Sequence, residues 1–328
     1  MKEEDIRKRG SFNRYLELVQ EDVRRLMNDR SSFVAVACPA CQGQVHDAQF
    51  VKNGFSYVLC RDCGTLFASP RPASEALCAF YKDSRSSRFW VDEFFKPVAE
   101  VRRAKIFRPR AEYIRDRLPS LSNGVIGDIG AGFGIFLEEL AKSWPLSRKV
   151  AIEPSLEMAE ICKSKQLEVV PCAIEDVQGW DGKFNLMTAY ELLEHLYSPA
   201  DFIERVARLL RPGGHLLITT LNGEGFDIQI LWGASKSVSP PHHLNFFNPC
   251  SLRRLLESKG FEIVELATPG RLDWDIVENM YRAEDVDPGR FWKLIADRSS
   301  EKAKGELQEW LSQNGLSSHM RILAQKRC

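Results

Sequence analysis

The sequence of 328 residues lacks any apolar run approaching the roughly 20 residues that a membrane-spanning helix needs. Its opening residues, MKEEDIRKRG, are charged where a signal peptide would become apolar, so we expect a cytoplasmic protein. It also lacks net charge, because 45 Lys and Arg balance 45 Asp and Glu, and no overall field draws it to nucleic acid or anionic membranes. Repeats and low-complexity segments are missing too. With 44% hydrophobic and 27% charged residues, the composition predicts a folded protein of one or two domains.

Composition divides the chain into four regions. Residues 1–32 predict an amphipathic helix, whose apolar stripe recurs at steps of four and three: Phe12, Leu16, Val19, Val23 and Leu26. The stripe favours packing on the helix's own domain, and it permits a homodimer without requiring one. Residues 33–72 combine short β-like runs with paired cysteines, and 73–118 predict a helical linker with a kink or break at Pro109. From 119 to 328, strand-like and helix-like segments alternate.

This alternation predicts an α/β fold, with an open, mostly parallel Rossmann-like sheet and helices on both faces. The expected strands are 124–129, 148–153, 167–172, 183–189, 215–221 and 261–267, with a last strand at Met320–Gln325. Residues 272–312 predict a C-terminal helical insertion.

Four of the nine cysteines form two C-x-x-C pairs that lie eighteen residues apart: Cys38, Cys41, Cys60 and Cys63. This spacing is typical of a four-thiolate structural zinc site in a small zinc-ribbon-like module. Gly43 and Gly64 follow the pairs and are expected to supply the permissive backbone of each metal knuckle. A redox dithiol at Cys38 and Cys41 is the alternative, which the second pair disfavours.

A glycine-rich loop follows the strand expected at 124–129. Its G-x-G-x-G spacing differs from the dinucleotide fingerprint, which would place a third glycine at Ile135. Asp128, two residues before Gly130, would repel a pyrophosphate but suits the cationic amino-acid part of S-adenosylmethionine. Glu153, at the end of the next strand, is expected to accept hydrogen bonds from ribose hydroxyls. The alternative is an exposed carboxylate at a strand end.

Five ordered segments in residues 100–328 resemble the class I S-adenosylmethionine-dependent methyltransferases. They are Asp128–Gly134, Ala151–Pro154, Ala173–Asp176, Tyr190–Leu196 and Leu210–Gly214. The resemblance implies that S-adenosylmethionine contacts Asp128, Gly130, Ala131, Gly132, Phe133, Gly134, Glu153, Pro154, Ile174, Glu175, Asp176, Tyr190, Glu191 and His195. His195 lines the cofactor site or caps the following helix in this interpretation.

The cysteine module, the exit Ser69–Pro72 and the segment Pro241–Phe247 resemble a subgroup in which a zinc-binding module precedes the methyltransferase domain. Members of that subgroup often modify sugars in polysaccharide or natural-product pathways. The resemblance therefore implies a small-molecule acceptor of sugar type, methylated at a hydroxyl or carbon.

Residues 222–248 follow the fifth strand and are expected to form a lid over the acceptor. A histidine can take a hydroxyl proton at neutral pH, and by resemblance His243 is the candidate base. His242 is either its neighbour in the site or a surface residue, and Tyr190 is the third candidate catalytic side chain. Alternatively, both histidines only hydrogen-bond the lid backbone.

Two other functions remain open at this point. An RNA methyltransferase is suggested by the zinc module and by seven basic residues in one segment: Arg102, Arg103, Lys105, Arg108, Arg110, Arg115 and Arg117. Interleaved acids favour a solvated helix instead, and Thr188–Glu191 lacks the signature of many base methyltransferases. A non-catalytic binding protein is disfavoured by the intact glycine loop.

Overall fold

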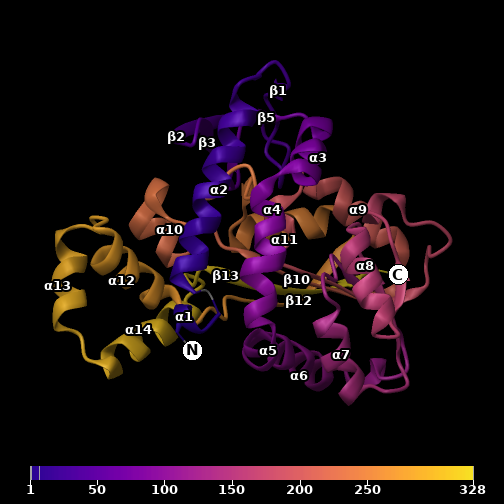
Figure 1. The fold of residues 1–328 in the computed structure, drawn as a ribbon. Coiled ribbons are helices and arrows are strands. Elements are labelled where there is room, and N and C mark those ends of the chain that lie inside the picture. The colour runs from indigo at the N-terminus through magenta and orange to yellow at the C-terminus, as the bar shows by residue number, and fades with distance from the viewer. Residues whose placement is uncertain (1, 7, 328) are drawn as a thin grey trace.

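A seven-stranded sheet forms the centre of the computed structural model, which describes residues 2–6 and 8–327 (Figure 1). Its strand order is β12-β13-β10-β9-β6-β7-β8. The strands are β6 (Val125–Ile129), β7 (Arg148–Ile152), β8 (Glu168–Val170), β9 (Phe184–Tyr190), β10 (Leu210–Leu221), β12 (Phe261–Ala267) and β13 (His319–Lys326). Only β13 runs antiparallel to its neighbours within this sheet. The predicted mostly parallel α/β sheet is confirmed.

Helices cover both faces of this sheet because alternate residues of its strands are apolar on each side. On β10, Leu216 and Ile218 pack in one core cluster, whereas Leu217 packs in the other. Helices α9 and α11 cover the first face, and α6, α7 and α8 cover the second (Figure 1). Their bounds are α6 (Arg108–Arg117), α7 (Ile135–Ser143), α8 (Leu156–Ser164), α9 (Pro199–Leu209) and α11 (Pro249–Ser258).

The cysteine segment forms an antiparallel sheet with the order β11-β4-β3-β2. Its strands are β2 (His46–Lys52), β3 (Phe55–Cys60), β4 (Leu66–Ala68) and β11 (Asn245–Phe246), while β1 (Phe33–Val34) pairs separately with β5 (Arg71–Pro72). Strand β11 comes from the predicted lid, residues 222–248. The cysteine segment and the lid therefore share one sheet.

The second of the two N-terminal helices packs on this shared sheet. These helices are α1 (Glu3–Ile6) and α2 (Arg9–Met27), and residue 7 between them lies outside the described part of the chain. Phe12, Val19 and Val23 of α2 join a core cluster with Tyr57 of β3 and Phe246 of β11. The apolar stripe is thus buried against its own chain.

Residues 74–121 form a chain of short helices that leads to the central sheet. They are α3 (Ser74–Asp83), α4 (Arg85–Phe89), the π-helical η1 (Trp90–Phe95), η2 (Lys96–Val98), α5 (Ala99–Arg102), the π-helical η3 (Arg103–Phe107), α6 and η4 (Pro119–Leu121). The expected kink or break at Pro109 falls where the helix type changes, because the π-helical η3 ends at Phe107 and α6 begins at Arg108. Pro109 lies in the first turn of α6, where its missing N–H is not needed by the helix.

The helical insertion forms a side cluster beside α10 (Phe226–Leu231). It consists of α12 (Asp273–Glu284), α13 (Arg290–Arg298) and α14 (Glu301–Gln313), and the remaining short turns are η5 (Ile174–Asp176), η6 (Leu193–His195) and η7 (Trp232–Ala234). Among the described residues, no helix combines the length and apolarity required to cross a membrane.

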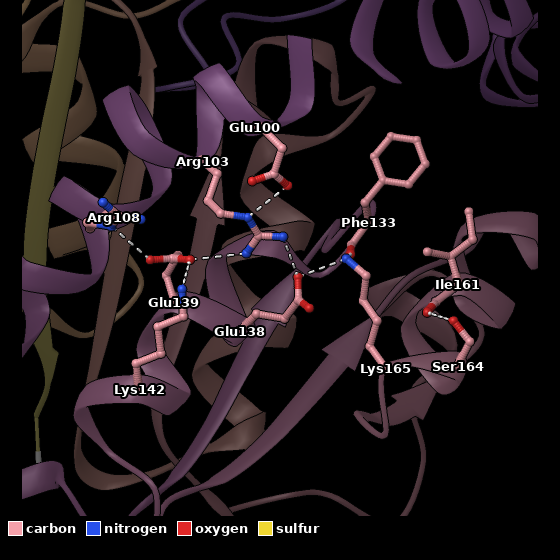
Figure 2. A network of polar contacts seen from close by, with 10 residues as sticks. All are labelled: Glu100, Arg103, Arg108, Phe133, Glu138, Glu139, Lys142, Ile161, Ser164 and Lys165. Atoms are coloured by element: carbon pink, nitrogen blue, oxygen red, sulfur yellow. Dashed lines mark hydrogen bonds and ion pairs between the residues drawn. The ribbon is translucent and has the colours of Figure 1, made fainter. Parts of the chain in front are cut away.

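An ionic network joins the short helices to α7 (Figure 2). Arg103 contacts Glu100, Glu138 and Glu139 at 3.0–3.1 Å. Burial alone would raise the pKa of Glu139, but hydrogen bonds from Lys142, Arg103 and Arg108 outweigh it and lower this pKa to about 2. The ionised form of Glu139 therefore stabilises the packing of the short helices on α7.

We predict that Glu139→Gln lowers the free energy of unfolding by about 2 kcal/mol at neutral pH, because three cations lose their shared acceptor. Because the pKa of Glu139 is lowered in the folded state, its stabilising contribution is fully present above the ordinary pKa of the carboxyl group. That contribution is lost as the pH falls through the folded-state pKa. The difference from the unmodified protein should therefore shrink between about pH 5 and pH 2.

Urea unfolding at several pH values measures this difference. Glu100→Gln is the matched control, because Glu100 binds the same Arg103 but its side chain is 81% exposed. Equal effects of the two variants would contradict the assigned role of Glu139.

Candidate active site

The glycine loop connects β6 to α7 at the carboxyl edge of the sheet. Gly130, Gly132 and Gly134 have φ values of +67°, +55° and +67°, a left-handed conformation that favours glycine. A Cβ on Gly134 would lie 2.5 Å from a methyl carbon of Leu167, whereas one on Gly132 would meet nothing within 4 Å. The loop is therefore packed tightly at its end and open at its middle. Ala131 and Phe133 lie between these glycines.

Two buried carboxylates flank the loop. Asp128 is 4% exposed and accepts a 2.6 Å hydrogen bond from Thr188 Oγ1, and burial raises its pKa to about 7. Glu153 is 5% exposed and accepts hydrogen bonds from the backbone N–H of Gly132 at 2.7 Å and of Ser155 at 2.9 Å. The alternative of an exposed carboxylate at Glu153 is wrong, and burial raises its pKa.

A cation that the sequence did not single out lies beside these acids. The Arg110 guanidinium lies 4.3 Å from the Tyr190 ring centre and donates a 3.0 Å hydrogen bond to Glu191. Its charge opposes the effect of burial on the pKa of Asp128. Within the described residues, the buried Tyr190 hydroxyl has no hydrogen-bond partner. The sequence places Arg110 among seven basic residues of one segment, and their spacing does not distinguish Arg110 from the others.

These features test whether S-adenosylmethionine fits. S-adenosylmethionine carries an ammonium, a carboxylate and ribose hydroxyls. The open space at the middle of the loop, the two buried acids, the cation beside them and the Tyr190 hydroxyl suit these groups. The donor set therefore fits this cofactor.

The other predicted cofactor residues lie on neighbouring loops of the same edge. Strand β6 pairs with both β7 and β9, so the segments that follow these three strands meet there. Pro154 is exposed after β7, and Glu191 and His195 follow β9. In η5, Ile174 is buried, whereas Glu175 and Asp176 are exposed.

His243 lies beside the segment that follows β9. Its Nδ1 is 2.6 Å from the Ser237 carbonyl, and a carbonyl can only accept, so Nδ1 carries a proton and, in the neutral ring, Nε2 carries the lone pair. The His243 ring centre is 4.8 Å from that of His195, whose pKa is lowered by burial to about 4. Donor atoms of Glu194, His195 and His243 lie within 4.8 Å of one another, a group that could hold a metal ion.

His242 points into a different environment. It is 5% exposed, packs against Tyr15, Phe80 and Tyr81, and lies within hydrogen-bond distance of Ser86 Oγ at 3.3 Å. Burial lowers its pKa to about 3. The alternative of a surface residue is wrong, because the contacts of His242 are with α2, α3 and α4. The two adjacent histidines therefore face different surroundings.

The cysteine segment holds the backbone at His243 and after it. Tyr57 donates a 2.6 Å hydrogen bond to the His243 carbonyl, and the Ala68 N–H donates to the Leu244 carbonyl at 2.9 Å. Asn248 Nδ2 donates to the Cys63 carbonyl at 3.0 Å. The position of His243 thus depends on contacts with the cysteine segment.

The four predicted cysteines converge within this segment. Their sulfur atoms lie within 4.8 Å of one another, with Cys38–Cys63 and Cys41–Cys60 both at 3.5 Å. Tetrahedral zinc with bonds of 2.3 Å would separate its sulfur ligands by about 3.8 Å, so the donor set fits zinc.

The two cysteine turns differ in the residue that takes the left-handed conformation. Gly64 takes it in the second turn with φ +70°, as expected, but in the first turn Gln42 takes it with φ +62°, and Gly43 does not. A Cβ on Gly43 would approach the Asp62 carboxylate and lie 3.2 Å from Cys41 Sγ. Gly43 is therefore needed for close packing beside a sulfur.

A family model described as a methyltransferase domain matches residues 102–266, half of the chain. The chain belongs to this methyltransferase family. It is an S-adenosylmethionine-dependent enzyme.

Curated relatives of this methyltransferase are named ubiquinone biosynthesis O-methyltransferase. The enzyme from Thiobacillus denitrificans is 27% identical over 214 residues, 61% of this chain and 88% of the relative. Those from Vibrio parahaemolyticus and Alkalilimnicola ehrlichii are 27% and 30% identical over 43% of this chain, which spans 60% and 57% of their lengths. The match to the last two thus covers less than two thirds of each relative.

A solved structure shares the fold of the methyltransferase. The Burkholderia thailandensis 1,6-didemethyltoxoflavin-N1-methyltransferase, with bound 1,6-didemethyltoxoflavin and S-adenosylhomocysteine, is 15% identical with a TM-score of 0.50. The alignment covers 86% of this chain and all of that one.

We predict that Asp128→Ala weakens binding of S-adenosylhomocysteine by at least tenfold, because the acid beside the glycine loop is lost. Calorimetric titration measures the affinity, and circular dichroism checks the fold. The exposed Asp201→Ala is the control. A folded Asp128→Ala protein with undiminished affinity would refute this role for the loop.

Proposed function

We propose that the enzyme methylates a hydroxyl oxygen of a small-molecule acceptor, with His243 as the general base. The observation that carries the proposal is the Nδ1 contact of His243 with the Ser237 carbonyl, which places the basic lone pair on Nε2. This ring lies beside His195, on the segment after β9 that the family resemblance assigns to the cofactor.

Bound S-adenosylmethionine supplies an electrophilic methyl group on a positively charged sulfur. His243 Nε2 takes the proton of the acceptor hydroxyl as the oxygen lone pair forms the new bond to the methyl carbon. S-adenosylmethionine, held at the glycine loop beside Asp128 and Glu153, would give up the methyl group with the bonding electrons left on sulfur, so the products would be the methyl ether, S-adenosylhomocysteine and protonated His243. The lid residues around His243 orient the acceptor and exclude water.

Burial of the neighbouring groups supports the base assignment. His195 is neutral at physiological pH because burial lowers its pKa to about 4. Burial raises the pKa of Glu194 to about 8, and Glu194 accepts a 2.8 Å hydrogen bond from Thr220. A neutral His195 does not repel the proton that His243 gains, so proton transfer is not opposed by a second imidazolium.

The acceptor we favour is a sugar-type hydroxyl, free or nucleotide-linked. The resemblance of the cysteine module and of Pro241–Phe247 to sugar-modifying enzymes supports this choice. The relatives' names support oxygen as the methylated atom, and they make an intermediate of ubiquinone biosynthesis the second acceptor to test.

Internal pairing of the basic segment favours a small molecule over RNA. Arg103 and Arg108 contact Glu139, Arg110 contacts Glu191, and Arg117 contacts Glu265 at 3.2 Å. Cations that are already paired with carboxylates bind phosphate groups weakly, so this segment is a poor binding surface for RNA.

Methyl-labelled S-adenosylmethionine, the purified enzyme and a cell extract test the proposal. We predict label in acid-soluble small molecules, with nucleotide sugars and phenols then assayed separately as purified acceptors. His243→Ala should lower the labelling rate about 100-fold, because the base is lost, while its affinity for S-adenosylhomocysteine persists.

His215→Ala is the control, because His215 pairs with Gln325 at the end of the β10–β13 ladder opposite to Leu221, and its loss should leave the rate unchanged. Label in RNA would overturn the small-molecule proposal. An unchanged rate in His243→Ala would remove His243 as the base.

We also propose that Cys38, Cys41, Cys60 and Cys63 hold a structural zinc ion. Four thiolates fill a tetrahedral shell, so the metal would supply folding free energy rather than chemistry. The convergence of four sulfur atoms supports this proposal.

We predict that Cys60→Ser releases the zinc, because one of its four ligands becomes a weakly binding hydroxyl. Elemental mass spectrometry measures the metal content, and Cys78→Ser, at an exposed cysteine outside the cluster, is the control. Zinc retained in full by Cys60→Ser would contradict the four-thiolate site.

A further inference from the structure

A fully buried carboxylate lies behind the turn that binds His243. Asp227 of α10 has no exposed surface. Its Oδ2 accepts hydrogen bonds from the hydroxyls of Ser235 at 3.0 Å and of Ser237 at 2.7 Å. Its Oδ1 is buried with no hydrogen-bond partner in the described part of the chain. A single oxygen atom thus secures both ends of the turn 235–237.

The same turn is held by further contacts. The Ser237 N–H donates to Ser235 Oγ at 3.1 Å, so the two serines are also joined to each other. From the cysteine segment, Lys52 Nζ donates a 2.6 Å hydrogen bond to the Ser235 carbonyl. The turn is thereby fixed between α10 on one side and β2 on the other.

The Ser237 carbonyl is the group of this turn that contacts His243. It accepts from Nδ1 of His243 at 2.6 Å, and a fixed acceptor at Nδ1 determines both the tautomer and the direction of the ring. We propose that Asp227 is a positioning residue for methyl transfer, which holds the turn 235–237 so that His243 presents the lone pair of Nε2. This inference rests on the proposed role of His243 as the base.

The hydrogen-bond geometry predicts which property of Asp227 matters. Because Oδ2 alone accepts both serine hydroxyls, an asparagine can keep its oxygen there and place its amide nitrogen at the position of Oδ1. The role should therefore survive removal of the charge and be lost only when the acceptor oxygen is removed.

The test compares Asp227→Ala with the conservative Asp227→Asn. We expect Asp227→Ala to lower kcat by about tenfold or more, while the affinity for S-adenosylhomocysteine changes less than twofold. The ¹⁵N NMR shifts of His243, measured without acceptor, should change from a single Nδ1-protonated tautomer to a mixture. Asp227→Asn should restore both the rate and the tautomer.

Asp273→Ala is the matched control for lost stability. Asp273 is also a buried aspartate that accepts hydrogen bonds from two serines, Ser317 and Ser318. Ser318 reaches α10 through the backbone N–H of Asp227 at 3.5 Å, but neither serine lies in the turn 235–237 or contacts the Asp227 carboxylate. Asp273→Ala should lower stability without moving the His243 shifts. If Asp227→Ala does not fold, Ser237→Ala removes one of the two hydroxyl contacts and should shift the tautomer in the same direction.

Unchanged His243 shifts in folded Asp227→Ala or Ser237→Ala would overturn the inference. That result is distinguishable from failure of the proposed function. Should His243→Ala keep its activity, the base assignment fails, whereas the NMR readout still reports whether Asp227 controls the ring.

Discussion

The pairing of β11 with β4 is the contact on which the arrangement of the site depends. Strand β11 is two residues long, yet it joins the lid after β10 to a sheet whose other strands adjoin the turns of the cysteine cluster. Tyr57 and Ala68 hydrogen-bond the backbone of His243 and Leu244 directly before it. A strand this short cannot be stable alone, so its position is set by the sheet that it joins.

Because of this dependence, the cysteine segment affects the candidate active site by positioning the lid, and it does not take part in the reaction itself. The segment sets where the lid backbone runs, and the lid in turn sets where the His243 ring lies. On its other side, the Leu244 N–H donates to the Glu194 carbonyl at 2.8 Å, which ties the same backbone to the segment after β9. His243 is therefore fixed between the cysteine segment and the edge of the sheet that carries the glycine loop.

Burial governs the charges at this edge. It raises the pKa values of Asp128 and Glu194 to about 7 and about 8 and lowers that of His195 to about 4. The two carboxyl groups, which would be fully charged in water, are thus partly or wholly neutral here until a ligand of opposite charge binds. Such a site favours a cationic cofactor beside Asp128.

The sequence allowed prediction of features that depend on local pattern. The strands of the central sheet follow from apolar runs, the four-cysteine cluster from C-x-x-C spacing, and the loop after β6 from its glycines. Strand β11 was not predictable, because two residues carry no periodicity and its partner β4 lies far away in the chain. The burial of His242 among aromatic rings likewise depends on helices distant in sequence.

Amide hydrogen exchange in the unmodified protein and in Cys60→Ser tests the central claim most directly. If the cysteine cluster holds the lid through β4 and β11, exchange should accelerate at residues 38–63 and also at 243–247, while β6 and β9 stay protected. Acceleration confined to 38–63 would contradict the claim, because the lid would then keep its position without the cluster.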